Sequence, residues 1–265
     1  MNFTKKDYTF EDLLAIMKVL RGEGGCPWDR EQTHESIKYA MLEEACEAME
    51  SLDKKTPDDF ADELGDLLLQ VVFHAEIGES NNTFSIQDVL NHICKKLISR
   101  HTHIFGDDKS ETAEDVLNLW EKNKLAEKGQ KTQTEAMRDV CAYLPALIRA
   151  EKVQKKAAKV GFDWDDVSGA FQKLHEETEE VEQAAKSGDS KKIEEELGDL
   201  LFSCVNVSRF LKVNPEEALK KASDKFVDRF EKVENAAEKL GKNLADMTLS
   251  EMDAIWDEVK KNENK

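Results

Sequence analysis

The stretch LEEACEAMESLDKKTPDDFADELGD, residues 42–66, decides the fold of this chain. Side chains three or four residues apart share one face of an α-helix, so its first three acids point one way, and its last two share a face of a second helix. Between them, Thr56-Pro57 is a helix-start signal with Thr56 as the cap. The stretch therefore predicts two helices joined by a turn. Its five acids are Glu43, Glu44, Glu47, Glu63 and Asp66.

The same acids return in the second half of the chain with every internal spacing unchanged. They are Glu176, Glu177, Glu180, Glu196 and Asp199. Two further pairs also recur in the same order, a Lys and Arg four residues apart and then a Trp and Lys four residues apart. These are Lys96, Arg100, Trp120 and Lys124 in the first half, and Lys225, Arg229, Trp256 and Lys260 in the second. A pattern repeated in this way predicts an internal duplication.

Apolar residues follow helical spacing through most of the chain, and no alternating run of strand length is present. We expect an all-α fold of two tandem helical-bundle domains, residues 1–130 and 131–265, with a polar linker near 127–134. Ser85 with Asp88 and Ser250 with Asp253 have the spacing of helix-start boxes. The expected helices span 10–20, 33–52, 57–79, 85–100, 112–127, 144–159, 168–187, 190–211, 215–240 and 250–262.

The helix after Pro57 separates an apolar stripe from its acids. Gly65 lies in the middle of this helix, and Gly198 occupies the matched position in the second half. Glycine inside a helix costs about 1 kcal/mol relative to alanine, so we expect another element to approach the backbone closely there. The stripe consists of Leu64, Leu67, Leu68, Val71 and Val72.

Composition narrows the classes of function. The net charge of −18 argues against a general nucleic-acid or anionic-membrane binder, because phosphate contacts need basic patches. The longest uncharged runs are too short to span a bilayer. Five scattered cysteines form neither a disulfide framework nor a metal motif, which fits a reducing compartment. We therefore expect a cytoplasmic protein that binds neither nucleic acid nor membrane.

The repeated constellation indicates chemistry on a nucleotide. Like charges 4 Å apart cost about 4 kcal/mol per pair at an effective dielectric near 20, so clustered carboxylates need a cation or raised pKa values. An all-oxygen set favours Mg²⁺ over Zn²⁺. Lys and Arg on one helix face suit phosphates, and a nearby Trp can stack on a base. A solvated acidic surface is the competing interpretation, and the absence of Glu-x-x-His pairs excludes a di-iron carboxylate bundle.

Taken together, these motifs resemble the MazG family of nucleoside triphosphate pyrophosphohydrolases in its two-domain bacterial form. The resemblance covers nearly the whole chain. The motifs that carry it are Gly25-Cys26-Pro27-Trp28-Asp29, Leu42-Glu43-Glu44, Glu63-Leu64-Gly65-Asp66-Leu67-Leu68, Arg100-His101, Gly161-Phe162-Asp163-Trp164, Glu195-Glu196-Leu197-Gly198-Asp199-Leu200-Leu201 and Lys225-Phe226.

The resemblance implies an all-α homodimer that hydrolyses nucleoside triphosphates of broad base specificity to monophosphate and pyrophosphate, as nucleotide-pool housecleaning or regulation. It implies Mg²⁺ as cofactor, with Mn²⁺ as a substitute. The implied metal ligands are Glu177, Glu180, Glu196 and Asp199, with Glu44, Glu47, Glu63 and Asp66 as a second set. The implied nucleotide contacts are Lys173, Lys225, Arg229, Trp256 and Lys260, with Lys96, Arg100, Trp120 and Lys124 in the first half.

Two mechanistic expectations complete this interpretation. The carboxylates hold metal that orients water for attack at the α-phosphorus, and Glu176 is our candidate to accept the proton from that water. The resemblance favours the second half as the main catalytic half. A non-catalytic nucleotide sensor or acidic helical interaction module is the alternative, which the analysis of reaction products distinguishes from the enzyme.

Overall fold

The computed structural model describes residues 4, 6–54, 57–129 and 132–263, and within these ranges it contains helices, turns and loops but no strand. The expected all-α fold is confirmed. The chain divides into two compact units, Met1–Glu127 and Lys128–Lys265. Residues 130 and 131, at the expected domain boundary, lie outside the described residues. No helix in the described part combines the length and apolar composition that crossing a bilayer requires.

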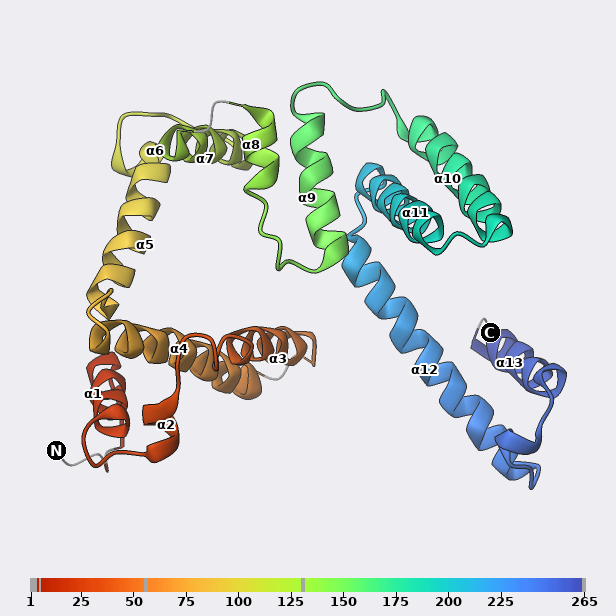
Figure 1. The fold of residues 1–265 in the computed structure, drawn as a ribbon, viewed down its shortest axis with the longest axis horizontal. Coiled ribbons are helices and arrows are strands. Elements are labelled where there is room, and N and C mark those ends of the chain that lie inside the picture. The colour runs from red at the N-terminus through yellow and green to blue at the C-terminus, as the bar shows by residue number, and fades with distance from the viewer. Residues whose placement is uncertain (1–3, 5, 55–56, 130–131, 264–265) are drawn as a thin grey trace. The chain divides into compact units, whose positions relative to one another are not determined.

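The first unit is built around the long helix α4, against which α1, α3 and α5 pack. Figure 1 shows α3 and α4 side by side, in orange. The helices are α1 (Phe10–Arg21), α2 (Pro27–Glu31), α3 (Ala40–Lys54), α4 (Pro57–Ser80), α5 (Ile86–Arg100), α6 (Thr102–Phe105) and α7 (Ala113–Lys128).

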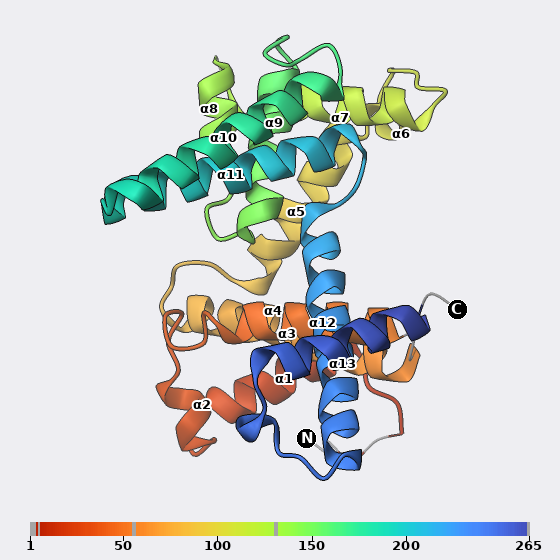
Figure 2. The same cartoon turned by 90° about the vertical axis from the view of Figure 1, so that its right-hand side faces the viewer.

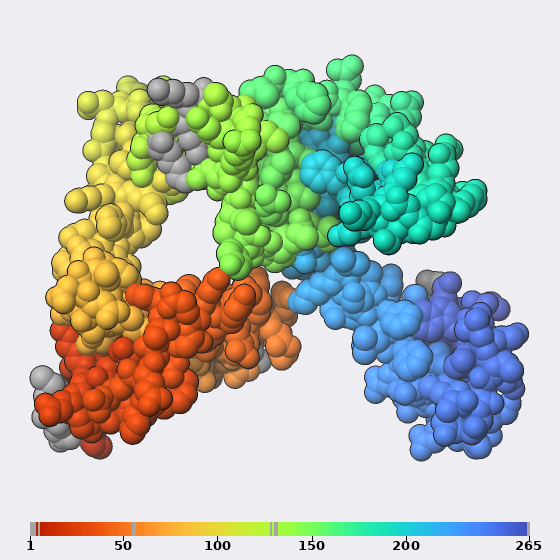
Figure 3. Space-filling view, viewed as in Figure 1, coloured from red at the N-terminus to blue at the C-terminus, as the bar shows by residue number. Residues whose placement is uncertain are grey.

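The second unit has a central pair of helices, α10 and α11, with α9 packed against α11. Figure 2 shows α10 and α11 running alongside one another. In the space-filling view, α12 and α13, in blue, close against one another (Figure 3). The elements are α8 (Gln133–Arg138), α9 (Ala146–Ala158), α10 (Val167–Ser187), α11 (Ser190–Phe210), α12 (Pro215–Lys239), the 3₁₀ turn η1 (Leu244–Asp246) and α13 (Leu249–Glu263).

The core of the first unit lies between α1 and α4. Met17, Val72 and Phe73 are almost fully buried there, with Ile37 and Ile77 completing the cluster. Burying each such side chain contributes about 1.5–3 kcal/mol. Of the expected apolar stripe on α4, only Val72 belongs to this core, because Leu64, Leu68 and Val71 are exposed. Leu64, Leu68 and Val71 therefore face outward from the first unit.

The expected helix over 33–52 begins later than predicted. Residues 34–39 form turns, and α3 starts at Ala40. Thr33 Oγ1 accepts from the Ser36 amide, and Ser36 Oγ accepts from the Thr33 amide. Ser and Thr side chains that bond to nearby backbone compete with regular helix, which accounts for the shift.

The start of a helix was predicted correctly where the sequence offers a single pair of residues with capping-box spacing. Ser85 with Asp88 makes the expected capping box on α5. Thr56, the expected cap of α4, lies outside the described residues. The predicted start at Ser250 with Asp253 is wrong, because Thr248 with Glu251 has the same spacing two residues earlier and makes the reciprocal bonds. Lys242 Nζ also pairs with Glu251 at 2.6 Å, which favours that register.

We predict that Thr248→Ala lowers the free energy of unfolding by about 1 kcal/mol, because the Glu251 amide in the first turn of α13 loses its side-chain acceptor. Ser250→Ala is the matched control, since Ser250 is exposed two residues away, and its effect should stay below about 0.5 kcal/mol. Urea unfolding measures both values. Equal effects of the two substitutions would contradict the observed cap.

Candidate active site

A short turn brings α10 and α11 together. Asp166 caps α10 by accepting from the Ser168 amide. Gly188 ends the helix with a left-handed φ of 71°, a conformation that other residues rarely adopt. Asp189 then caps α11 by accepting from the amides of Lys191 and Lys192. This Gly-Asp connection turns the chain back, so that acids far apart in sequence face one another across the two helices.

The expected acids of the second half converge in this helix pair. Carboxylate oxygens of Glu177 on α10 and of Glu196 and Asp199 on α11 lie within 4.8 Å of one another. Glu177 also belongs to a group of the same tightness with Glu176 and Glu180. Glu177 is therefore the member common to both groups.

Glu177 is also the most deeply placed of these acids, with 3% of its surface exposed. One of its oxygens, Oε1, lies 2.6 Å from Lys173 Nζ, and the same amine lies 2.7 Å from Glu176 Oε1. The other oxygen, Oε2, is buried and has no hydrogen-bond partner. A buried carboxylate oxygen without a partner is costly, and a cation is the group that relieves it best.

Electrostatics within the cluster agree with this geometry. Burial raises the pKa of Glu180, and the charges of Glu177 and Glu196 raise it further. The hydrogen bonds that Lys173 donates to Glu176 and Glu177 raise the pKa of its amine. One lysine offsets only part of the charge of five acids. The donor set of several carboxylates and no thiol or imidazole fits a hard divalent ion such as Mg²⁺.

The first unit repeats the cluster with differences. Glu44, Glu47 and Glu63 bring carboxylate oxygens within 4.8 Å of one another, and Asp66 lies outside that group. Burial raises the pKa of Glu44, with added effects from the charges of Asp66 and Glu47. Burial, followed by the charge of Glu47, raises the pKa of Glu63.

The residue one turn before the central acid also differs between the units. The second unit has Lys173 four residues before Glu177, whereas the first has Ala40 four residues before Glu44. In its place, Gln70 Nε2 donates to Glu44 Oε1 at 3.4 Å. The two clusters therefore share spacing but differ in how the central acid is supported.

The two arginines expected to bind the nucleotide, Arg100 and Arg229, each contact one glutamate and one tryptophan of their own unit. Arg229 Nε donates to Glu263 Oε2 at 2.8 Å, and its guanidinium lies 5.9 Å from the centre of the Trp256 ring. In the first unit Arg100 Nε donates to Glu127 Oε2 at 2.9 Å, and its guanidinium carbon lies 5.4 Å from the centre of the Trp120 ring. Arg100 is 6% exposed, so little of it faces solvent.

Sequence reasoning missed both glutamates in these contacts. Glu127 and Glu263 each follow the tryptophan of their unit by seven residues, and this matched spacing is a signal that could have identified them. The remaining expected nucleotide contacts lie on the same elements. Lys96 and Lys225 are exposed on α5 and α12, Lys260 is exposed on α13, and Lys124 is half-buried on α7.

Comparison with known proteins identifies the repeated unit. The family model of the MazG nucleotide pyrophosphohydrolase domain matches residues 32–105 and again residues 167–234. Both matches contain an acid cluster, and both include the expected arginine of their unit.

Similar proteins cover almost the full length. The chain is 45% identical over 251 residues to a Thermotoga maritima protein named nucleoside triphosphate pyrophosphohydrolase/pyrophosphatase MazG, covering 95% of each chain. It is 42% identical over 254 residues to the Escherichia coli K12 nucleoside triphosphate pyrophosphohydrolase, covering 95% of this chain and 97% of that one. It is also 45% identical to the uncharacterized protein YabN of Bacillus subtilis, over 97% of this chain and 53% of that protein.

We predict that Mg²⁺ stabilises the second unit through its acid cluster. In a chain whose first cluster is disabled by Glu47→Gln, Mg²⁺ at about 100 times its dissociation constant should add about 2.7 kcal/mol to the stability, measured as a rise in melting temperature. Glu196→Gln should remove most of that rise because Glu196 supplies a cluster oxygen.

Glu195→Gln is the matched control for this measurement. Glu195 is the neighbouring acid on α11, is exposed and lies outside the cluster. It should keep the wild-type response to Mg²⁺. If both substitutions reduce the rise equally, the ion interacts with the general negative charge of α11 and not with the cluster.

Proposed function

The chain belongs to the MazG family, and from that membership and the site geometry we propose that it hydrolyses nucleoside triphosphates in the second unit with Mg²⁺ as cofactor. The enzyme is a nucleoside triphosphate pyrophosphohydrolase, as are its named relatives from T. maritima and E. coli. Cleavage between the α- and β-phosphorus releases nucleoside monophosphate and pyrophosphate.

One observation carries the choice of site. Glu177 Oε2 is buried without a partner at the point where both groups of acids of the second unit meet. Glu177, Glu180, Glu196 and Asp199 would hold Mg²⁺ there, with Mn²⁺ as a substitute. The bound ion would supply charge neutralisation of the triphosphate and orientation of water.

The chain's own groups then have separate roles. Glu176 is more than half exposed at the edge of the cluster, which suits it to accept the proton of the attacking water. Lys173 holds both Glu176 and Glu177, so it fixes the position of the base and of a metal-binding acid together. In-line attack at the α-phosphorus breaks the bond to the bridging oxygen, and pyrophosphate leaves.

Lys225 and Arg229 supply the positive charge that a triphosphate needs. They lie four residues apart on α12, so both face the same way. Trp256 and Lys260 on α13 complete this part of the nucleotide site. Because Trp256 stacks and offers no base-edge pattern, we propose broad base specificity and a role in nucleotide-pool housecleaning.

We also propose that the enzyme is a homodimer, and that the outward apolar faces of α4 and α11 meet the second copy. Leu64 and Leu68 are 44% and 41% exposed, and their counterparts Leu197 and Leu201 are 43% and 55% exposed. A side chain added at Gly65 or Gly198, which lie within these faces, would meet no other atom within 4 Å. The described chain does not make the close approach expected at these glycines, and we propose that a helix of the second copy fills the open space beside them.

The cysteines support the proposed cytoplasmic location. All five are free thiols, and four of them are exposed. Exposed free thiols persist in a reducing compartment.

We predict that the wild-type enzyme, with Mg²⁺, converts each common nucleoside triphosphate to monophosphate and pyrophosphate, and that chelation stops the reaction. Glu177→Ala should lower kcat at least about 100-fold, because the cluster loses its central acid. Glu44→Ala, at the matched position of the first unit, should retain activity. Chromatographic separation of the products measures the reaction, and formation of diphosphate and phosphate would contradict attack at the α-phosphorus.

We predict that Leu201→Glu dissociates the dimer, because a charge on this face cannot be buried without a partner. The measurement is molar mass by light scattering after gel filtration, over a range of concentrations. Leu211→Glu is the matched control, since Leu211 is 54% exposed just after the end of α11 and should leave the mass unchanged. A wild-type chain that stays monomeric at all concentrations would refute the homodimer.

A further inference from the structure

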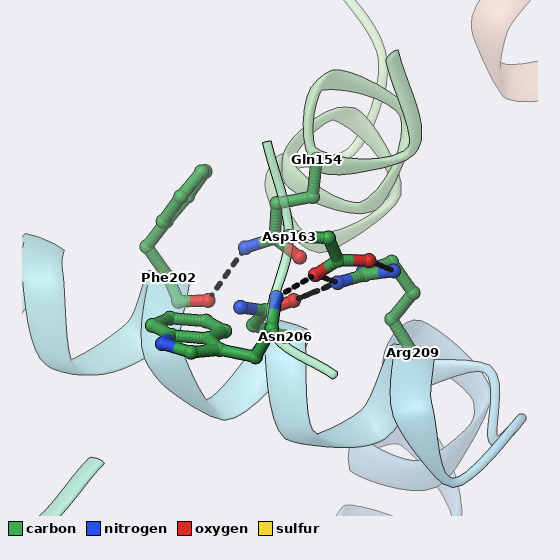
Figure 4. A network of polar contacts seen from close by, with 6 residues as sticks. Gln154, Asp163, Phe202, Asn206 and Arg209 are labelled. Atoms are coloured by element: carbon green, nitrogen blue, oxygen red, sulfur yellow. Dashed lines mark hydrogen bonds and ion pairs between the residues drawn. The ribbon is translucent and has the colours of Figure 1, made fainter. Parts of the chain in front are cut away.

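An ion pair with little exposure joins the loop before α10 to the last turn of α11. Arg209 Nη1 donates to Asp163 Oδ2 at 2.8 Å, and Arg209 Nη2 donates to Asp163 Oδ1 at 2.5 Å (Figure 4). The side chains of Arg209 and Asp163 are 12% and 23% exposed, and they come from positions 46 residues apart. Isolated surface pairs contribute little to a structure, whereas bidentate pairs within a network of contacts fix geometry. This pair is of the second kind.

Both members of the pair are held by further contacts. Arg209 donates to Asn206 Oδ1 from Nε at 2.9 Å and from Nη2 at 2.7 Å (Figure 4). Asp163 Oδ1 also accepts from the Trp164 amide at 3.0 Å. The Trp164 indole packs so closely on Gly169, in the first turn of α10, that a side chain at residue 169 would collide with it. The ion pair therefore connects the start of α10 to the end of α11.

Apolar packing does little to hold this loop. The loop and Asn206 border a cavity of about 650 Å³ that also reaches α8 and α9. The two aromatic residues of the loop, Phe162 and Trp164, are 82% and 43% exposed. Because the loop lies beside an opening, its polar contacts are what hold it on α11.

The acid cluster lies midway between two joined ends of the helix pair. The turn at Gly188 joins one end, and the ion pair joins the other. Glu177 follows the start of α10 by ten residues, and Asp199 precedes Arg209 by ten residues, so each acid lies about 15 Å from the end that the ion pair joins. A shift of α11 by one residue moves a side chain by about 1.5 Å along the axis and about 100° around it. The ion pair opposes such a shift.

The first unit repeats the acids without this ion pair. The position of Asp163, directly before the tryptophan of the loop, is Pro27 in the first unit, and the position of Arg209, ten residues after the last acid, is Glu76. Neither of these two residues can replace its counterpart in the pair. The last acid of the first unit, Asp66, also lies outside the group of three carboxylates there, whereas the last acid of the second unit belongs to its group. The ion pair and a fully assembled cluster therefore occur together.

Asn206, which accepts from the guanidinium, also has a different counterpart. Seven residues after its last acid the first unit has Phe73, which is 4% exposed. Arg21 of α1 lies 5.1 Å from the centre of the Phe73 ring and donates to the carbonyls of Asp29 and Gln32. The first unit therefore uses an arginine of α1 and an aromatic ring of α4 where the second unit uses an ion pair to α11.

We propose that Asp163 and Arg209 are positioning residues of the metal site, an inference that rests on the proposed function of the acid cluster. Their ion pair sets the register of α11 against α10, and this register places the carboxylate of Asp199 beside that of Glu177. The pair itself lies about 15 Å away from these acids along the helices, so it acts through the backbone and not by touching the ion. Without the pair, the second cluster loses its last acid, as the first cluster has done.

The test measures binding of Mn²⁺ by electron paramagnetic resonance in a chain whose first cluster is disabled by Glu47→Gln. Asp163→Asn and Arg209→Gln should each weaken binding about 10-fold, since residues that orient metal ligands have effects of this size. The two substitutions change the net charge in opposite directions, so an effect of charge alone would weaken binding in one variant and strengthen it in the other. Effects of opposite sign would overturn the proposal.

Glu151→Gln is the matched control. Glu151 is 19% exposed and pairs at 2.7 Å with Lys155 on the same helix, α9, so its loss removes one charge and one ion pair but leaves α10 joined to α11. This variant should bind Mn²⁺ as the wild type does. In an Asp199→Asn background, Asp163→Asn should change the affinity by less than about 2-fold, because the acid that the pair positions is already absent. A full 10-fold loss there would also contradict the proposal, and this comparison decides if Arg209→Gln fails to fold.

Crystal structures of the wild type and of Asp163→Asn, both without metal, test the position of the acid directly. In the variant the Asp199 carboxylate should lie outside the 4.8 Å group that it forms with Glu177 and Glu196, and an unmoved carboxylate would overturn the proposal. A wild-type chain that binds no Mn²⁺ through this cluster would refute the proposed function. The two structures would still decide whether the ion pair positions Asp199.

Discussion

Repulsion among carboxylates is the constraint on which the rest of this structure depends. Two helices of each unit bring three or more acids within 4.8 Å of one another, an arrangement that opposes folding unless positive charge is close. Lys173 meets part of that need in the second unit, and one buried oxygen of Glu177 has no hydrogen-bond partner, which is where we propose that Mg²⁺ binds. The helix caps, the Gly188 turn and the packing of α9 on α11 hold the acids in position against their own repulsion.

The contacts of the two arginines are a second feature that both units share. Arg100 with Trp120 and Glu127, and Arg229 with Trp256 and Glu263, repeat one arrangement of ion pair and aromatic ring. The carboxylate orients the guanidinium, and the ring supports its flat face. Arg229 is more exposed than Arg100, with side-chain values of 19% and 7%, so the second unit offers its arginine to a ligand more readily.

The sequence predicted the helices and the acids that share a face, because both follow from spacing along one helix. Contacts between helices were harder to predict. Glu127 and Glu263 were missed because the arginines that they bind lie 27 and 34 residues earlier, and only their matched spacing from the tryptophans marks them in the sequence. The apolar stripe of α4 was predicted, but its direction was not, because periodicity does not say whether Leu64 meets its own core or another chain. The boxes at Thr248 and Ser250 have the same spacing along the chain, and the ion pair with Lys242, which lies outside the helix, favours the box at Thr248.

The two units also differ at the position seven residues after the last acid of each cluster, where the first unit has the buried Phe73 and the second has Asn206. A buried aromatic ring adds apolar contacts to a core, whereas an amide beside a cavity forgoes them. At this position the first unit therefore gains apolar packing, whereas the second unit has an amide that lines a cavity. Duplication permits this division, because a chain with one stable copy tolerates a less stable copy beside it. The two halves therefore share the spacing of their acids but differ in how their cores are packed.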